Sequence, residues 1–438
     1  DVTDNTTNIR EVVLDVLLEV LENHNLSHLV LKQALKKYLF LERQDRAFIT
    51  RCVEGTLEYR IQIDAVIDRF SKVKTAKMKP VIREILRMSV YQILYMERVP
   101  DSAVCNEAVK LAKKRKFQGL SGFVNGVLRS VARNLDKVKY PDPKEMPVPY
   151  LSVTYSMPEW IVTMWLKDYG REKTEEILKS FYLSRPTTIR VNENQISKEE
   201  LIKKLKNEHV NVEEHPFLNS ALLISDYDYL GALNSFCEGD FQIQDAASIQ
   251  VAESADIKPG DYIIDVCAAP GGKALHAAQL LNGTGHVEAR DLTEYKVGLI
   301  QENIWRMGFD NVEAVQQDAT LFDEASEEKA DVVIADLPCS GLGVLSKKTD
   351  LKYKMTLETE KEVAQLQKEI LDVVCRYVKP EGVMIYSTCT ICKAENEENT
   401  RWFLEKHPEF ELEWEKQIFP ARETDGFYIA KLVKRSSK

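Results

Sequence analysis

Three of the eight cysteines in this 438-residue sequence stand in short motifs whose spacing could support chemistry. Cys339 follows a proline in "DLPCSG", and Cys389 and Cys392 close the stretch "YSTCTIC". The C-x-x-C spacing is compatible with half of a zinc site, with a redox dithiol, or with one nucleophilic thiol beside a thiol that has no role. The choice depends on which other ligands and which secondary structure accompany the pair.

A zinc site usually takes four ligands from two close pairs, whereas this sequence has one C-x-x-C and no histidine within a few residues of it. A redox C-x-x-C normally opens a helix, whose N-terminus lowers the pKa of the first thiol. Here Cys389 ends an expected strand, and the helical pattern begins only after Cys392. The sequence therefore favours a nucleophilic Cys389 and predicts no metal site.

The elements expected to position these thiols lie in residues 241–438, where short apolar runs alternate with helical stretches. This alternation is typical of a doubly wound α/β sheet, in which ligands bind at the carboxyl ends of the strands. The last residues of each strand are therefore expected to carry function. The candidate strands are residues 262–268, 286–291, 312–318, 331–338, 382–389 and 427–434.

The first of these strands runs into "DVCAAPGGK", residues 265–273. Its glycines and proline let the backbone approach a ligand closely, but the spacing is neither G-x-G-x-x-G nor a P-loop. The second strand ends at Asp291, which suits ribose hydroxyls, and the third at Asp318, which can accept from an exocyclic amine. Asp336 and Cys339 follow the fourth strand. Cys339 is thus predicted beside the ligand loop, at the tip of the strand adjacent to the one that ends in the C-x-x-C motif.

The N-terminal part of the chain has a different pattern of apolar residues. Residues 8–135 show helical spacing of apolar residues without strand alternation, and "KYPDPKEMPVPY" then places four prolines in a linker. We expect three domains: all-α in residues 1–140, a small α+β module in 151–240 and a catalytic α/β domain in 241–438.

The net charge of −10 is unevenly distributed. Residues 1–140 hold 25 Lys+Arg against 17 Asp+Glu, and the remainder holds 34 against 52. A basic front is compatible with RNA binding, although a merely solvated basic face is an equal alternative. No apolar run reaches the roughly 18 residues of a transmembrane helix, and the N-terminus lacks an apolar signal core. Together with the scattered cysteines, these features predict a cytoplasmic protein with reduced thiols and no membrane partner.

The motifs "DVCAAPGGK", "DLPCSG" and "YSTCT…ENEE" resemble, in order and spacing, those of the RNA cytosine-C5 methyltransferases that use S-adenosyl-L-methionine (AdoMet). "FITRCVEGTLEY" and "FVNGVLR" resemble a NusB-type RNA-binding domain, and nearly the whole chain is similar to the RsmB type of bacterial 16S rRNA methyltransferases. The resemblance implies a multi-domain protein with a NusB-like all-α domain, a small α+β module and a Rossmann-like class I methyltransferase domain. It also implies 16S ribosomal RNA as partner and AdoMet as methyl donor, and we expect a monomer.

By the same resemblance, Cys389 is the nucleophile that adds to C6 of cytosine, and Cys339 assists its release. Asp336 would contact the base or the AdoMet amine, and Lys273 would favour the thiolate as a nearby cation. Two alternatives remain open: a transfer-RNA methyltransferase with the same chemistry, and an RNA-binding factor that keeps the fold without catalysis. The implied AdoMet-binding residues are Cys267, Ala268, Ala269, Pro270, Gly271, Gly272 and Lys273 around the methionine part, Asp291 at the ribose, Asp318 at the adenine, and Asp336.

Overall fold

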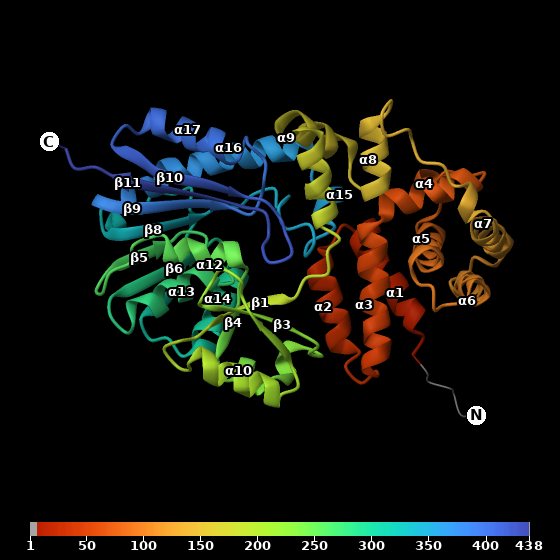
Figure 1. The fold of residues 1–438 in the computed structure, drawn as a ribbon, viewed down its shortest axis with the longest axis horizontal. Helices are drawn as coiled ribbons and strands as arrows, with labels where there is room; N and C mark the ends of the chain where they lie inside the picture. Colours follow the sequence, from red (N-terminus) through yellow and green to blue (C-terminus); the bar gives the residue numbers. More distant parts are fainter. Residues whose placement is uncertain (1–6, 438) are drawn as a thin grey trace. The chain divides into compact units, whose positions relative to one another are not determined.

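The computed structural model describes residues 7–437 of the chain, which form two compact units (Figure 1). The first unit comprises Asp1–Lys179, described from residue 7 onward, together with Leu345–Lys354. The second comprises Ser180–Val344 and Met355–Lys438, described as far as residue 437. The chain therefore leaves the second unit for one short segment and then returns to it.

The first unit is helical, and the sequence predicts this for its N-terminal part, residues 8–135. Asn8 begins its first helix because the Asn8 side chain accepts from the backbone N–H groups of Arg10 and Glu11. Pro80, which has no N–H to leave unsatisfied, begins another helix. The apolar stripes of the helices share one buried core. The helices are α1 (Ile9–Leu17), α2 (Ser27–Lys37), α3 (Arg43–Glu58), α4 (Arg60–Phe70), α5 (Pro80–Tyr95), α6 (Asp101–Lys114), α7 (Ser121–Arg133), α8 (Pro147–Tyr155), α9 (Glu159–Ser180) and, from later in the chain, α15 (Leu351–Lys354).

The segment Leu345–Lys354 completes the first unit by binding the ends of two of its helices. Asp350 accepts from the backbone N–H of Ser27 at 3.1 Å and from the Ser27 hydroxyl, at the start of α2. Lys352 Nζ donates to the carbonyl oxygen of Glu58, at the end of α3, at 2.7 Å. The segment thus supplies an acceptor to a helix N-terminus and a donor to a helix C-terminus, where backbone groups lack partners within the helix.

The second unit opens with a small antiparallel sheet of order β2-β3-β1-β4 (Figure 1). Ser197 begins the helix that covers this sheet, because its hydroxyl accepts from the Glu200 N–H at 3.1 Å. This is the α+β module that the sequence predicts ahead of the catalytic sheet. Its elements are β1 (Thr187–Val191), α10 (Lys198–Asn207), β2 (Asn211–Glu214), β3 (Ala221–Ser225), α11 (Asn234–Cys237) and β4 (Phe241–Ile243).

The rest of the second unit is a seven-stranded sheet of order β10-β11-β9-β8-β5-β6-β7. The strands from β9 to β7 are parallel, and β11 and β10 extend one edge in antiparallel fashion. The elements are α12 (Ala246–Glu253), β5 (Tyr262–Asp265), α13 (Gly272–Leu281), β6 (His286–Asp291), α14 (Glu294–Met307), β7 (Val312–Gln316), β8 (Ala330–Asp336), α16 (Leu357–Val374), β9 (Val378–Thr388), α17 (Glu397–Lys406), β10 (Phe410–Ile418) and β11 (Phe427–Lys434).

Helices cover both faces of this sheet (Figure 1). Side chains alternate across a strand, so Ile263 of β5 packs with α12, α13 and α14, while Ile264 packs with α16 and α17 on the opposite face. The doubly wound sheet that the sequence predicts is therefore confirmed. In residues 7–437, no helix is both long and apolar enough to cross a membrane.

Candidate active site

Two thiols meet at the carboxyl ends of the parallel neighbours β8 and β9. Asp336, the last residue of β8, is in register with Ser387 of β9, so the loops that follow the two strands start side by side. Cys339 and Cys389 lie in these loops, both half-buried, with their sulfur atoms 3.1 Å apart. Hydrogen bonding to Cys389 and then burial hold the pKa of Cys339 well above its usual value. Cys339 therefore carries a proton that it can share with its neighbour.

A half-buried cation lies near the thiol pair. Lys273 Nζ, from the first turn of α13, is 2.7 Å from Asp336 Oδ2, and the Ser387 hydroxyl donates to Asp336 Oδ1 at 2.9 Å. Burial lowers the pKa of Lys273, but the charges of Asp336, Asp265 and Cys389 outweigh burial and hold that pKa above its usual value. Lys273 thus stays protonated, with Asp336 as its ion-pair partner.

The loop between β5 and α13 contains a cis proline and a glycine in a left-handed conformation. Ala269–Pro270 is a cis peptide, and Gly271 has φ +115°, a left-handed conformation that favours glycine. α13 begins directly afterwards at Gly272, so the N–H groups of its first turn face the same loop. Burial raises the pKa of Asp265, at the end of β5, to about 8, against the opposing effect of Lys273.

The aspartates at the next two strand ends have different surroundings. Asp291, buried at the end of β6, accepts from the Ala269 N–H at 2.9 Å through Oδ2 and from the Leu292 N–H at 2.7 Å through Oδ1. Asp318 lies two residues beyond the end of β7, and its Oδ1 accepts from the hydroxyl and N–H of Thr320. These hydrogen bonds lower the pKa of Asp318. Asp291 therefore braces the ligand loop, and each of its oxygens keeps a second lone pair for a ligand.

The polar groups at this edge of the sheet fit AdoMet, which presents a sulfonium, an ammonium group, a carboxylate and two ribose hydroxyls. Asp291, Asp318 and Asp336 provide acceptors near the ends of β6, β7 and β8. The first turn of α13 favours an anion. AdoMet bound there would supply an electrophilic methyl group.

Cys392 has neighbours that the sequence did not suggest. It is fully buried, its sulfur lies 3.8 Å from Ser340 Oγ, and burial raises its pKa well above the usual value. Glu360, Cys392 and Glu395 bring three potential ligand atoms within 4.8 Å of one another. Both Glu395 oxygens, however, accept hydrogen bonds from Ser340, whose hydroxyl also lies beside Cys392. Glu395 stands in the "ENEE" part of the third motif, where the sequence assigns it no role.

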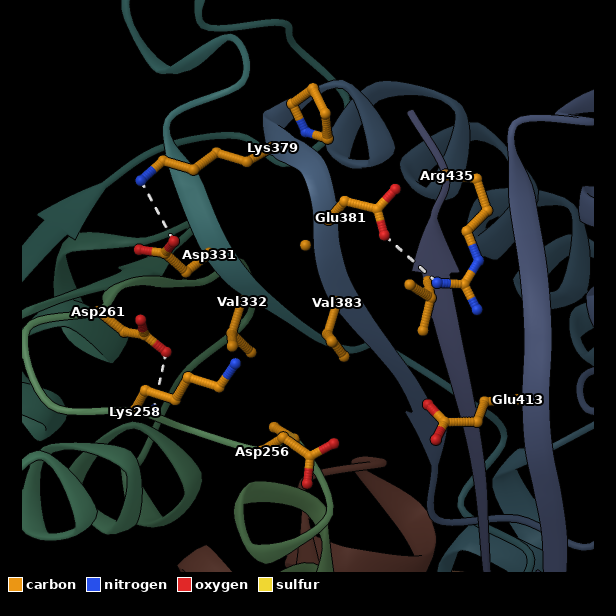
Figure 2. Close-up of a pocket in the computed structure, with 14 residues that line it drawn as sticks. Asp256, Lys258, Asp261, Asp331, Val332, Lys379, Glu381, Val383, Glu413 and Arg435 are labelled. Atoms are coloured by element: carbon orange, nitrogen blue, oxygen red, sulfur yellow. Dashed lines mark hydrogen bonds and ion pairs between the residues drawn. The ribbon is translucent and has the colours of Figure 1, made fainter. Parts of the chain in front are cut away.

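A separate pocket of about 480 Å³ lies at the opposite end of the parallel strands (Figure 2). Its charged side chains largely face each other: Lys379 pairs with Asp331 at 3.2 Å, and Arg435 with Glu381 at 3.3 Å. Residues at the start of β8 and β9 line it, whereas the thiols follow the ends of these strands. The pocket therefore takes no part in the chemistry of the thiols.

Three family sequence models match the chain in the order of its structural parts. The NusB family matches residues 7–133, the ferredoxin-like domain of RsmF/B-like methyltransferases matches 157–227, and the family described as 16S rRNA methyltransferase RsmB/F matches 254–433. The fold and the site therefore define an AdoMet-dependent methyltransferase with an N-terminal NusB domain.

Similar proteins extend this agreement to the full length. A probable ribosomal RNA small subunit methyltransferase B of Bacillus subtilis (strain 168) is 36% identical, over 98% of this chain and 99% of the relative. The corresponding Yersinia pestis bv. Antiqua (strain Angola) protein is 28% identical over 98% of this chain and 100% of its own. The crystal structure of PH0851 superposes with a TM-score of 0.84 at 28% identity, over 98% of this chain and 99% of that chain. The structure of NSun6 from Pyrococcus horikoshii with SFG has a TM-score of 0.58 at 25% identity, covering 64% of this chain and 99% of that one. The chain belongs to the RsmB/F family of 16S rRNA methyltransferases.

Proposed function

We propose that the protein transfers the methyl group of AdoMet to C5 of a cytosine in 16S rRNA, through a covalent bond between Cys389 and C6 of the base. The observation that carries this proposal is the thiol pair, 3.1 Å apart, beside the Lys273–Asp336 ion pair. C5 of cytosine is a poor nucleophile, so the reaction needs a group that raises its electron density. A thiolate with a cation beside it is suited to that task.

The steps assign a role to each thiol. The Cys389 thiolate forms the S–C6 bond, and the electron pair of the C5–C6 double bond becomes available at C5. C5 then takes the methyl group as the bond between that methyl and the sulfonium sulfur breaks, so S-adenosyl-L-homocysteine leaves and C5 still carries its original proton. A base removes that proton, the C5–C6 double bond forms again, and the S–C6 bond breaks to release Cys389 as a thiolate. We assign Cys339 to this release because its sulfur is next to that of Cys389.

The proposal extends to the cofactor-binding residues that the family resemblance implies. The loop 267–272 would hold the methionine part of AdoMet. Lys273 and Asp336 would lie between the cofactor and the target cytosine. Asp291 would accept from the ribose hydroxyls, and Asp318 would lie at the adenine. The hydrogen bond from the Ala269 N–H to Asp291 supports this arrangement, because it places the carboxylate beside the loop.

We also infer the broader setting. Residues 1–140 would form the RNA-binding domain, 151–240 the small module and 241–438 the catalytic domain. The excess of Lys+Arg in the front part, 25 against 17 Asp+Glu, supports an RNA partner there. The protein would act as a monomer in the cytoplasm.

The test is bisulfite sequencing of ribosomal and transfer RNA from a strain that lacks the gene, complemented with variants. One 16S cytosine should lose its methylation in the deletion strain and regain it with the wild type and with Cys392→Ala. Cys389→Ala should fail to restore it while binding AdoMet normally, because its thiol contacts the base. A methylation loss confined to transfer RNA would refute the ribosomal substrate, and an inactive but folded Cys392→Ala would refute a single nucleophile.

A further inference from the structure

Each active-site cysteine is followed by a buried hydroxyl residue. Ser340 comes directly after Cys339, and Thr390 directly after Cys389. The two side-chain oxygens lie 2.9 Å apart, within hydrogen-bonding distance. The loops that carry the thiols are therefore joined one residue beyond each sulfur atom. Neither nucleophilic attack by Cys389 nor release by Cys339 accounts for this second connection.

Glu395 anchors the hydroxyl pair. It is fully buried, and its Oε1 accepts from the Ser340 N–H at 2.7 Å while its Oε2 accepts from the Ser340 hydroxyl at 2.7 Å. Gln367 Nε2 also donates to Oε1, at 3.2 Å. A serine hydroxyl has a single proton, which Ser340 gives to Glu395, so the Thr390 hydroxyl must donate to Ser340. The hydrogen bonds therefore run in one direction, from Thr390 through Ser340 to Glu395.

The surroundings of Glu395 make this connection rigid. Burial raises the pKa of Glu395, and the hydrogen bonds from Ser340 oppose that effect by stabilising the carboxylate. A buried carboxyl group is stable only when its oxygens take part in several hydrogen bonds. The next residue, Asn396, accepts from the Thr388 hydroxyl at 2.5 Å and donates to the Thr390 carbonyl oxygen at 3.0 Å. Both neighbours of Cys389 are thus fixed by the same short stretch.

We propose that Glu395, through Ser340 and Thr390, is a positioning residue that sets the spacing between the thiols of Cys339 and Cys389. This inference rests on the proposed function, because the spacing matters only if both thiols act on one base. Displacements of about 1 Å can cost about 100-fold in rate, so a rigid connection next to the reacting atoms has catalytic value.

The test uses a probe that needs neither RNA nor AdoMet. Phenylarsine oxide condenses with two neighbouring thiols: two As–S bonds form, and the oxygen leaves as water with both thiol protons. Mass spectrometry of digested protein identifies the bridged pair, and Cys389→Ala must abolish the bridge between positions 339 and 389. The variants are Thr390→Val, which keeps the shape but loses the hydroxyl, Thr390→Ser, which keeps the hydroxyl, and Glu395→Gln, which replaces one of the two accepting oxygens with an NH2 group that cannot accept.

Thr390→Val and Glu395→Gln should slow the bridging and lower kcat for cytosine methylation by about 10- to 100-fold, with the KM for AdoMet unchanged. Thr390→Ser should keep both at the wild-type level. Wild-type bridging in Thr390→Val and Glu395→Gln would overturn the proposal, and so would slow bridging with unchanged kcat. If Glu395→Gln fails to fold, the Thr390→Val and Thr390→Ser pair decides. If even the wild type methylates no RNA, the proposed function fails, while the bridging rates still report the thiol spacing.

Discussion

Replacing Asp291 with alanine should weaken AdoMet binding and destabilise the fold at the same time. The carboxylate is 6% exposed and accepts two backbone hydrogen bonds, from Ala269 in the ligand loop and from Leu292. A hydrogen bond to a charged acceptor contributes about 1.5–3 kcal/mol, and water can reach part of this loop after the change. We therefore expect the free energy of unfolding to fall by about 2–4 kcal/mol.

The loss of the proposed ribose contact should weaken AdoMet binding by about 1–3 kcal/mol, which is roughly 5- to 150-fold in Kd. Asp291→Asn is the matched control, because its single carbonyl oxygen can keep one of the two N–H partners and should show about half of each effect. Titration calorimetry gives the affinity and urea unfolding gives the stability. Reduced stability with unchanged affinity in Asp291→Ala would show that Asp291 braces the loop without meeting the ligand.

Three further predictions concern other parts of the chain. Cys339→Ala should accumulate an SDS-resistant complex with RNA through Cys389 that requires AdoMet, because methyl transfer proceeds while release stalls; normal turnover without this band would make Cys339 a packing residue. Changing Lys113 and Lys116, at the end of α6, to Gln should flatten the salt dependence of RNA binding by about 0.7–0.9 for each phosphate that is no longer neutralised, and an unchanged slope would place the RNA elsewhere. Burial raises the pKa of Asp265 from 3.8 to about 8, so its contribution to stability is present below pH 3.8 and lost as the pH rises through about 8. Asp265→Asn should therefore gain stability relative to the wild type between pH 5.5 and pH 8 in urea titrations, and parallel pH profiles would contradict this.

The parallel part of the catalytic sheet could be predicted because its central strands are buried on both faces and read as short apolar runs. The edge strand β10 was missed. Its sequence, "FELEWEKQI", carries charges at alternate positions, and only its two end residues are buried. It pairs on one side only, with β11, and charged edge strands discourage pairing with other chains. Apolar content alone therefore does not identify such a strand.

The meeting of the two thiols also followed from the sequence, because parallel strands bring their carboxyl ends to one edge. The role of Glu395, in contrast, did not follow from the sequence. Its hydrogen bonds to Ser340 connect positions 55 residues apart, and no spacing rule relates a serine in the loop after β8 to a glutamate just before α17. The sequence also does not indicate that Leu345–Lys354 belongs to the helical unit. No local sequence pattern marks a segment that packs with a distant part of the chain.

Because Leu345–Lys354 belongs to the helical unit, the order of synthesis affects when that unit can finish folding. The ribosome completes the helices up to Lys179 first, but Leu345–Lys354 follows only after all of Ser180–Val344 has been synthesised. At about 5–20 residues per second, the helical unit waits roughly 10–30 s for its last piece. During that time the start of α2 lacks Asp350 and the end of α3 lacks Lys352. The front of this protein therefore finishes folding late, although it emerges early.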